Sequence, residues 1–142
     1  MTHPQPSYTY FLDHALPKSV AATLRNLGYT VERLQDHFPV NTQDVDWLPV
    51  VSQRGWIVLT KDKNIGKRMI ELGAVANSNA RLFTLVSGNM SSAETAQVFA
   101  NVIGKCENIV QQEAAPFIFK IYKDGSVTRW RDANTMQQNV SP

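Results

Sequence analysis

Acidic residues in this chain stand where a parallel sheet would bring them together. Asp13 ends one hydrophobic run, and Asp62 follows another. Asp44 and Asp46 open a helix-like stretch that lies between them in the sequence. Parallel strands end at one edge of a sheet, where open α/β folds carry out their chemistry, so we expect these carboxylates to converge. Scattered carboxylate oxygens are the ligands that Mg²⁺ prefers, and the pattern therefore predicts a divalent-cation site.

Hydrolysis of a phosphodiester is the reaction that such a centre supports best. It needs an activated water and stabilisation of the charge on the leaving oxygen, and bound Mg²⁺ or Mn²⁺ supplies both. Taken singly, Asp13 and Asp62 are typical turn formers or helix caps, while Asp44 and Asp46 suit the positive end of a helix. Their joint placement favours a site in which all four are candidate catalytic residues.

A cluster of basic side chains surrounds the second acidic position. Its members are candidate substrate-binding residues: Lys61, Lys63, Lys67 and Arg68. The net charge of the chain is only +2, so it does not by itself indicate nucleic acid. Cations beside a carboxylate–metal centre suit a polyanion whose phosphates need positioning. A solvated helix face is the alternative interpretation of the same cluster.

Three further polar residues lie near the expected sheet edge. Thr60 either orients a carboxylate from behind the metal ligands or is an ordinary β-branched strand residue. Asn89 is a candidate substrate-binding residue as well as a typical turn former. His14 is adjacent to Asp13 and would touch substrate, or it is simply a buried or turn histidine.

The order of strand-like and helix-like segments predicts an α/β fold. Short buried strands are expected over these ranges: 8–12, 29–34, 56–60, 81–86, 117–122 and 127–130. Helical patterns separate the first five of them, which calls for parallel strands with helices on both faces. Asp124-Gly125 is a strong hairpin signal before the last strand. We therefore predict a three-layer α/β/α domain, with a mostly parallel central sheet and an antiparallel hairpin at its edge.

Capping signals fix the expected ends of the helices. Pro17 is placed to start the first helix and Gly28 to end it, and Thr42 is a plausible N-cap for the second. A basic third helix is expected over residues 65–72. Ser91 and Glu94 have the spacing of a capping box, which would open the longest helix.

The bulk properties are those of one soluble domain. The chain has 142 residues, of which 43% are hydrophobic and 18% charged. We expect a single domain over residues 1–142, with a core of about 8–130 and a flexible tail over 131–142. No apolar run approaches the roughly 20 residues of a membrane span, so no membrane partner is expected. The single cysteine, Cys106, fits a reducing cytoplasm.

Three short motifs follow one another along the chain: Phe11-Leu12-Asp13, then Asp44-Val45-Asp46-Trp47-Leu48, then Val58-Leu59-Thr60-Lys61-Asp62-Lys63. In this order they resemble the motifs of the PIN-like ribonuclease family. The resemblance runs from about Tyr10 to Val86 and is nearest to the compact branch that includes toxins of toxin–antitoxin pairs. The last motif alone is moderately specific, and the ordered set is considerably more so.

The resemblance implies a metal-dependent ribonuclease, with Asp13, Asp44 and Asp62 as the metal-binding acids. Larger relatives have one more acid between the first two, with no clear equivalent here; Asp46 would supply it, and Asp36 is a weaker candidate. The resemblance further implies Mg²⁺ or Mn²⁺ as cofactor, RNA as substrate and a cognate antitoxin that blocks the acidic groove. It also implies a homodimer.

Two other functions compete with a nuclease. A non-catalytic PIN-like module that binds RNA or protein would keep the same fold. A receiver-type phosphoacceptor domain also has acids at strand ends, but it would have an acidic pair after the first strand, where this chain has only Asp13. Comparing cleavage of RNA by the wild type and Asp13→Asn separates these possibilities.

Overall fold

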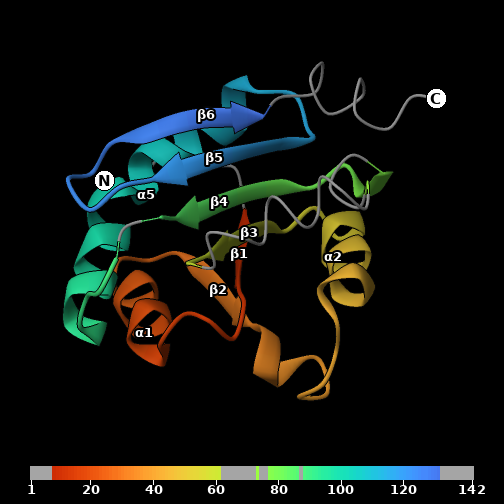
Figure 1. Ribbon diagram of the computed structural model, residues 1–142, viewed down its shortest axis with the longest axis horizontal. Coiled ribbons are helices and arrows are strands. Elements are labelled where there is room, and N and C mark those ends of the chain that lie inside the picture. Colours follow the sequence, from red (N-terminus) through yellow and green to blue (C-terminus); the bar gives the residue numbers. More distant parts are fainter. Residues whose placement is uncertain (1–7, 62–72, 74–76, 87, 132–142) are drawn as a thin grey trace.

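The computed structural model describes residues 8–61, 73, 77–86 and 88–131. Within these residues the sheet has six strands, in the order β2-β1-β3-β4-β5-β6 (Figure 1). The strands are β1 (Thr9–Leu12), β2 (Thr30–Arg33), β3 (Ile57–Thr60), β4 (Arg81–Leu85), β5 (Phe117–Ile121) and β6 (Val127–Arg131). All neighbouring pairs from β2 to β5 are parallel, and β6 runs antiparallel to β5 at the edge. The predicted sheet and its hairpin are confirmed.

Three helices lie where the sequence patterns predict them: α1 (Lys18–Asn26), α2 (Asp44–Gln53) and α5 (Ser92–Gln112). The short 3₁₀ helix η1 (Leu34–Asp36) was not predicted, and it begins at a residue expected to end the second strand. Pro17 is the N-cap of α1, and Gly28 follows its end with a positive φ of 96° that favours glycine. The capping box at the start of α5 is confirmed: the Ser91 hydroxyl accepts from the Glu94 N–H, and the Glu94 carboxylate accepts from the Ser91 N–H.

One predicted cap is wrong. The N-cap of α2 is Gln43 rather than Thr42, and it makes no side-chain capping bond. The Thr42 hydroxyl instead donates to the Pro39 carbonyl at 2.7 Å, within the preceding turn. That local bond competes with capping, as short polar side chains often do, and the helix therefore begins one residue later than a Thr42 cap requires. The expected helix over residues 65–72 lies outside the described residues.

Adjacent residues of β1 show how the layers are arranged. Tyr10 packs its ring edge against Tyr29, and its pKa is raised mainly by burial and also by the charge of Glu107 on α5. Phe11 points to the opposite face, where its ring centroid lies 5.2 Å from that of Trp47 on α2. Helices α1 and α5 therefore cover one face of the sheet and α2 covers the other. Figure 1 shows α1 and α5 together and α2 apart from them, which confirms the three layers.

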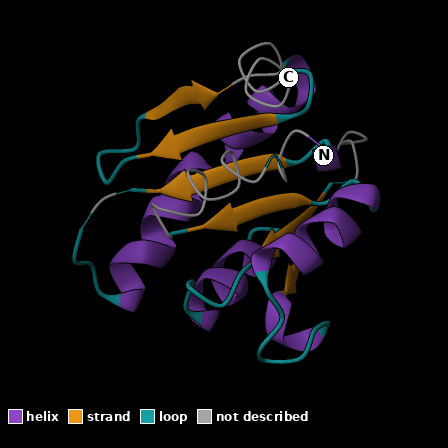
Figure 2. Cartoon of the chain, turned by 45° about the vertical axis from the view of Figure 1, so that its right-hand side comes forward, coloured by secondary structure: helices purple, strands orange, loops and turns teal. Residues whose placement is uncertain are grey.

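The core fills the space between these layers. Its largest fully buried side chains are Trp47, Tyr10, Phe11, Phe83, Phe99 and Phe117. Each such side chain contributes about 1.5–3 kcal/mol by leaving water, so the sheet and its helices are held mainly by apolar contact. Figure 2 shows the strands as one twisted sheet with helices outside it. Among the described residues, no helix is long and apolar enough to span a membrane.

Candidate functional site

Asp13 lies directly after the last residue of β1, at the edge where the parallel strands end. The register pairs Leu12 with Leu59, so that Asp13 is brought beside Thr60 on β3. The Thr60 hydroxyl donates to Asp13 Oδ2 at 2.6 Å, and the Ala15 N–H donates to Asp13 Oδ1 at 3.0 Å. Asp13 is only 2% exposed and Thr60 is fully buried. A strand end predicted to carry chemistry therefore holds a buried and oriented carboxylate.

The environment of Asp13 disfavours the ionised form of its carboxyl group. Burial raises the pKa of Asp13 from its ordinary value of 3.8 to about 6. The bonds from Thr60 and Ala15 oppose this rise, whereas the nearby carboxylate of Asp44 adds to it. A cation bound at this position would relieve both the desolvation and the repulsion. Strongly perturbed carboxylates of this kind are concentrated at functional sites.

Asp44 is the first residue of α2, and Trp47 fixes its side chain. The Trp47 indole N–H donates to Asp44 Oδ1 at 3.1 Å. Trp47 is itself fully buried against Phe11, which lies on the same face of β1 as Asp13. The core contact therefore places the start of α2 over the end of β1. The sequence pattern did not reveal this role, although the spacing of three residues on a helix was the signal.

Of the remaining acidic candidates, two are exposed and one lies outside the described residues. Asp46 is exposed and lies two residues from Asp44, so the two side chains do not share one side of the helix. Asp36 is exposed in η1. Asp62 lies outside the described residues, and within the described part of the chain no group of three or more metal-binding side chains is found.

The donor set that is described fits a hard cation. Asp13 and Asp44 supply carboxylate oxygens, and Asp13 uses only two of about four acceptor positions in its bonds to Thr60 and Ala15. No nitrogen or sulfur ligand stands among these groups. Oxygen donors with waters completing the shell suit Mg²⁺ or Mn²⁺ better than zinc.

The substrate-binding candidates divide into described and undescribed residues. Lys61 follows Thr60 and is half-buried, and Asn89 is exposed in the turn before α5. The structure does not bring Asn89 into contact with Asp13, whose bonds are those to Thr60 and Ala15. The other basic candidates, Lys63, Lys67 and Arg68, lie outside the described residues.

An open hollow adjoins Asp44 and His14, the residue after Asp13. Its volume is about 460 Å³, and its lining residues are His14, Val40, Asn41, Thr42, Gln43 and Asp44. His14 is exposed there, so it is not the buried histidine that the sequence also allowed. The loop before α2 therefore provides amide and hydroxyl groups next to the acidic site, a feature that no motif in the sequence indicated.

Comparisons with known proteins identify the family to which this fold belongs. The family described as PIN like domain matches residues 9–87, which is more than half of the chain. A protein of Mycobacterium tuberculosis named "Putative ribonuclease VapC45" is 26% identical over 119 residues, covering 79% of this chain and 84% of its own length. No solved structure matches. The family match spans Asp13, Asp44, Thr60 and Asp62.

Proposed function

We propose that this chain, which belongs to the PIN-like domain family, is a divalent-metal-dependent endoribonuclease that hydrolyses RNA phosphodiester bonds. The observation that carries the proposal is the buried carboxylate of Asp13, held by Thr60 next to Asp44 at the carboxyl edge of the parallel sheet. A carboxylate kept at a cost in free energy beside a second carboxylate is best explained by a cation that both bind.

The metal would be Mg²⁺ or Mn²⁺, held by Asp13, Asp44 and Asp62. When bound, such an ion supplies an activated water and neutralises charge on the leaving oxygen. The protein's own residues provide the positioning. Thr60 holds one oxygen of Asp13, and Trp47 holds one oxygen of Asp44, so that both carboxylates are oriented before substrate arrives.

The substrate would lie across the same edge. Phosphates flanking the cleaved bond would meet Lys61 and the basic residues that follow it in the sequence, which lowers the repulsion between RNA and the acidic site. Lys63, Lys67, Arg68 and Asn89 remain candidate contacts. His14 and the open hollow beside Asp44 lie where a neighbouring nucleotide would enter.

We further propose that the protein acts as the toxin of a toxin–antitoxin pair in the cytoplasm. The similarity to a mycobacterial protein named as a ribonuclease supports this, together with the ordered motifs of the compact toxin branch. A cognate antitoxin would cover the acidic edge and keep RNA away from Asp13 and Asp44. A homodimer is a further expectation from the family.

The direct test is cleavage of labelled single-stranded RNA by purified protein free of any partner, with Mg²⁺ or Mn²⁺ and with a chelator. We expect the chelator to stop cleavage, and Asp13→Asn, Asp44→Asn and Asp62→Asn each to lower the rate at least about 100-fold. Asp124→Asn removes an exposed carboxylate from the turn between β5 and β6 and serves as the matched control. Equal rates for the wild type and Asp13→Asn would overturn the mechanism. Binding of RNA without cleavage would favour a non-catalytic module.

A further inference from the structure

The β5–β6 hairpin is the most basic part of the described chain. Its residues 117–131 carry four cationic side chains and one carboxylate, a formal charge of +3 that exceeds the +2 of the whole chain. The four cations are Lys120, Lys123, Arg129 and Arg131. Such an asymmetry creates a local positive potential that the net charge of the chain conceals.

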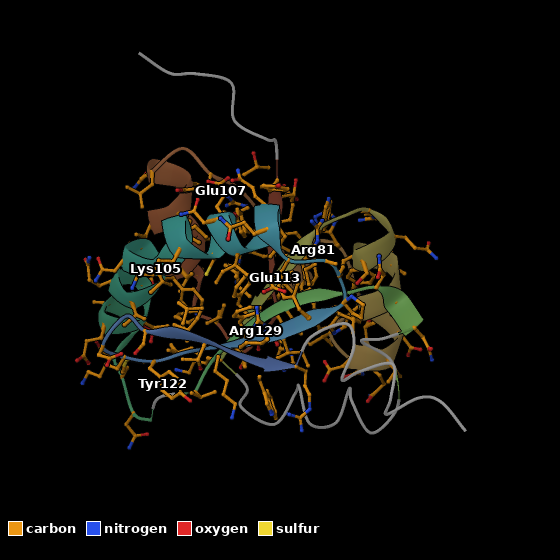
Figure 3. All side chains as sticks on the ribbon, turned by 90° about the horizontal axis from the view of Figure 1, so that it is seen from above. Arg81, Lys105, Glu107, Glu113, Tyr122 and Arg129 are labelled. Carbon is orange, nitrogen blue, oxygen red and sulfur yellow. The ribbon has the colours of Figure 1, made fainter. Side chains whose placement is uncertain are left out.

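Two of these cations are paired with carboxylates of α5 or its end. Arg129 donates to Glu113, the residue that caps the end of α5 (Figure 3). Lys123 lies 3.8 Å from Glu94. In the described part of the chain, by contrast, neither Lys120 nor Arg131 has a carboxylate within ion-pair distance.

Lys120 and Arg131 gather instead on one aromatic ring. The Lys120 Nζ lies 4.3 Å from the centre of the Trp130 ring, and the Arg131 guanidinium carbon lies 5.7 Å from it. Arg131 also donates to the Trp130 carbonyl at 3.0 Å. The indole attracts both cations through its ring quadrupole but neutralises neither. We call these three residues the Trp130 cluster, and each of them is half-buried rather than fully exposed.

The strand register places Lys120 on the same face of the sheet as the acidic site. Lys120 on β5 is paired with Thr84 on β4, and Thr84 is paired with Thr60 on β3. Residues paired in this way point to one face, which is the face of Asp13. Two strand spacings separate β3 from β5, so Lys120 lies roughly 10 Å across the sheet from Thr60.

We propose that the Trp130 cluster is a second RNA-binding surface, which holds phosphates of the substrate strand outside the carboxylate site. The identification of RNA rests on the proposed function. Single-stranded nucleic acids are bound by cations that follow the backbone together with aromatic side chains, which is the composition found here. Two like charges drawn to one ring, with no carboxylate partner among the described residues, are stabilised when a polyanion binds.

The test measures binding separately from cleavage. A fluorescent single-stranded RNA of about 16 nucleotides, long enough for one binding site, is titrated with protein carrying Asp13→Asn at several salt concentrations. Adding Lys120→Gln with Arg131→Gln should weaken binding about fivefold at low salt and reduce the slope of log K against log salt by about 1.4. Lys120→Arg with Arg131→Lys should bind like the parent protein, and thermal unfolding checks that each variant is folded.

The matched control removes the same charge elsewhere. Lys18→Gln with Arg54→Gln takes away two exposed cations, one of which, Arg54, also lies over a tryptophan ring. The proposal is wrong if this control and the hairpin variant change the salt slope equally, or if neither changes it. Loss of binding only in the hairpin variant supports it even where the wild type cuts no RNA, which would count against the proposed nuclease alone. Cleavage by the wild type with unchanged binding of the hairpin variant would count against the RNA-binding surface alone.

Discussion

The two faces of β1 each bury a polar group, and they treat it differently. On the face covered by α1 and α5, the Tyr10 side chain is buried, and its hydroxyl has no hydrogen-bond partner among the described residues. On the face covered by α2, the Asp13 carboxylate accepts two hydrogen bonds and lies near a second carboxylate. The Tyr10 hydroxyl is thus buried without a described hydrogen-bond partner, whereas hydrogen bonds orient the Asp13 carboxylate.

The two buried groups differ in whether they can carry a charge. Burial raises the pKa of the Tyr10 hydroxyl further above its ordinary value, so it stays neutral under all physiological conditions. A neutral hydroxyl with no hydrogen-bond partner among the described residues lowers stability slightly and performs no chemistry. Asp13 titrates near neutral pH, so its burial has a cost that a bound cation can remove. We take that contrast as the physical signature of the site.

The largest expected effect concerns stability against pH. The pKa of Asp13 is raised to about 6 in the folded protein, so between pH 4 and 6 the folded state binds more protons than the unfolded state. The contribution of this group is fully present below pH 3.8 and is lost as pH rises through about 6. Asp13→Asn should therefore be more stable than metal-free wild type at pH 8, by up to about 3 kcal/mol. Denaturant unfolding of both proteins from pH 4 to 8 measures this, and a difference that does not vary with pH would refute it.

A smaller effect is expected at the residue that orients Asp13. Thr60→Val keeps the shape of the side chain but removes the hydroxyl that donates to Asp13 Oδ2. Loss of a bond to a charged group should reduce stability by about 1.5–3 kcal/mol at pH 8 and raise the pKa of Asp13 further. The acid limb of the pH–rate profile for RNA cleavage should move to higher pH, and Thr60→Ser should restore it.

Thr84→Val is the control for that substitution. Thr84 is also buried and is paired with Thr60 in the register, but its hydroxyl does not donate to Asp13. It should leave the acid limb in place whatever it does to stability. Equal movement of the limb in both valine variants would show that Thr60 acts through packing rather than through Asp13.

The smallest effect on stability and cleavage is expected on the face of β1 that α1 and α5 cover. Tyr10→Phe removes a hydroxyl that makes no hydrogen bond to a described residue, so stability should change by less than about 1 kcal/mol, and in the direction of a gain. Cleavage of RNA should stay within about twofold of wild type. Thermal unfolding and the cleavage rate together measure this. A marked loss of activity would show that the two faces are not functionally distinct.

The parts of the fold that depend on short local patterns could be predicted from the sequence. Gly28 at the end of α1, the capping box at Ser91 and the Asp124-Gly125 turn were readable from short patterns and are confirmed. Thr42 failed as a cap because its hydroxyl bonds to Pro39 instead, and the same residue type allows either bond.

The parts that the sequence left open depend on contacts between distant residues. The bond from Thr60 to Asp13 joins residues 47 positions apart, so only the register of β1 and β3 decides between an orienting threonine and an ordinary strand residue. The raised pKa of Asp13 likewise follows from burial, which a strand-end aspartate does not reveal by itself. The fit of Asp44 to Trp47 depends on Trp47 packing against Phe11.

The central claim is that the buried carboxylate of Asp13 binds a divalent cation. Thermal unfolding with and without Mg²⁺ tests this most directly. Wild type and Asp13→Asn are compared at pH 8, with Mg²⁺ raised well above its dissociation constant. A ligand that binds only the folded state stabilises it by about 2.7 kcal/mol at one hundred times that constant. We predict that Mg²⁺ raises the unfolding temperature of the wild type and leaves that of Asp13→Asn unchanged. An equal rise in both proteins, or none in the wild type with Mg²⁺ or Mn²⁺, would contradict the account.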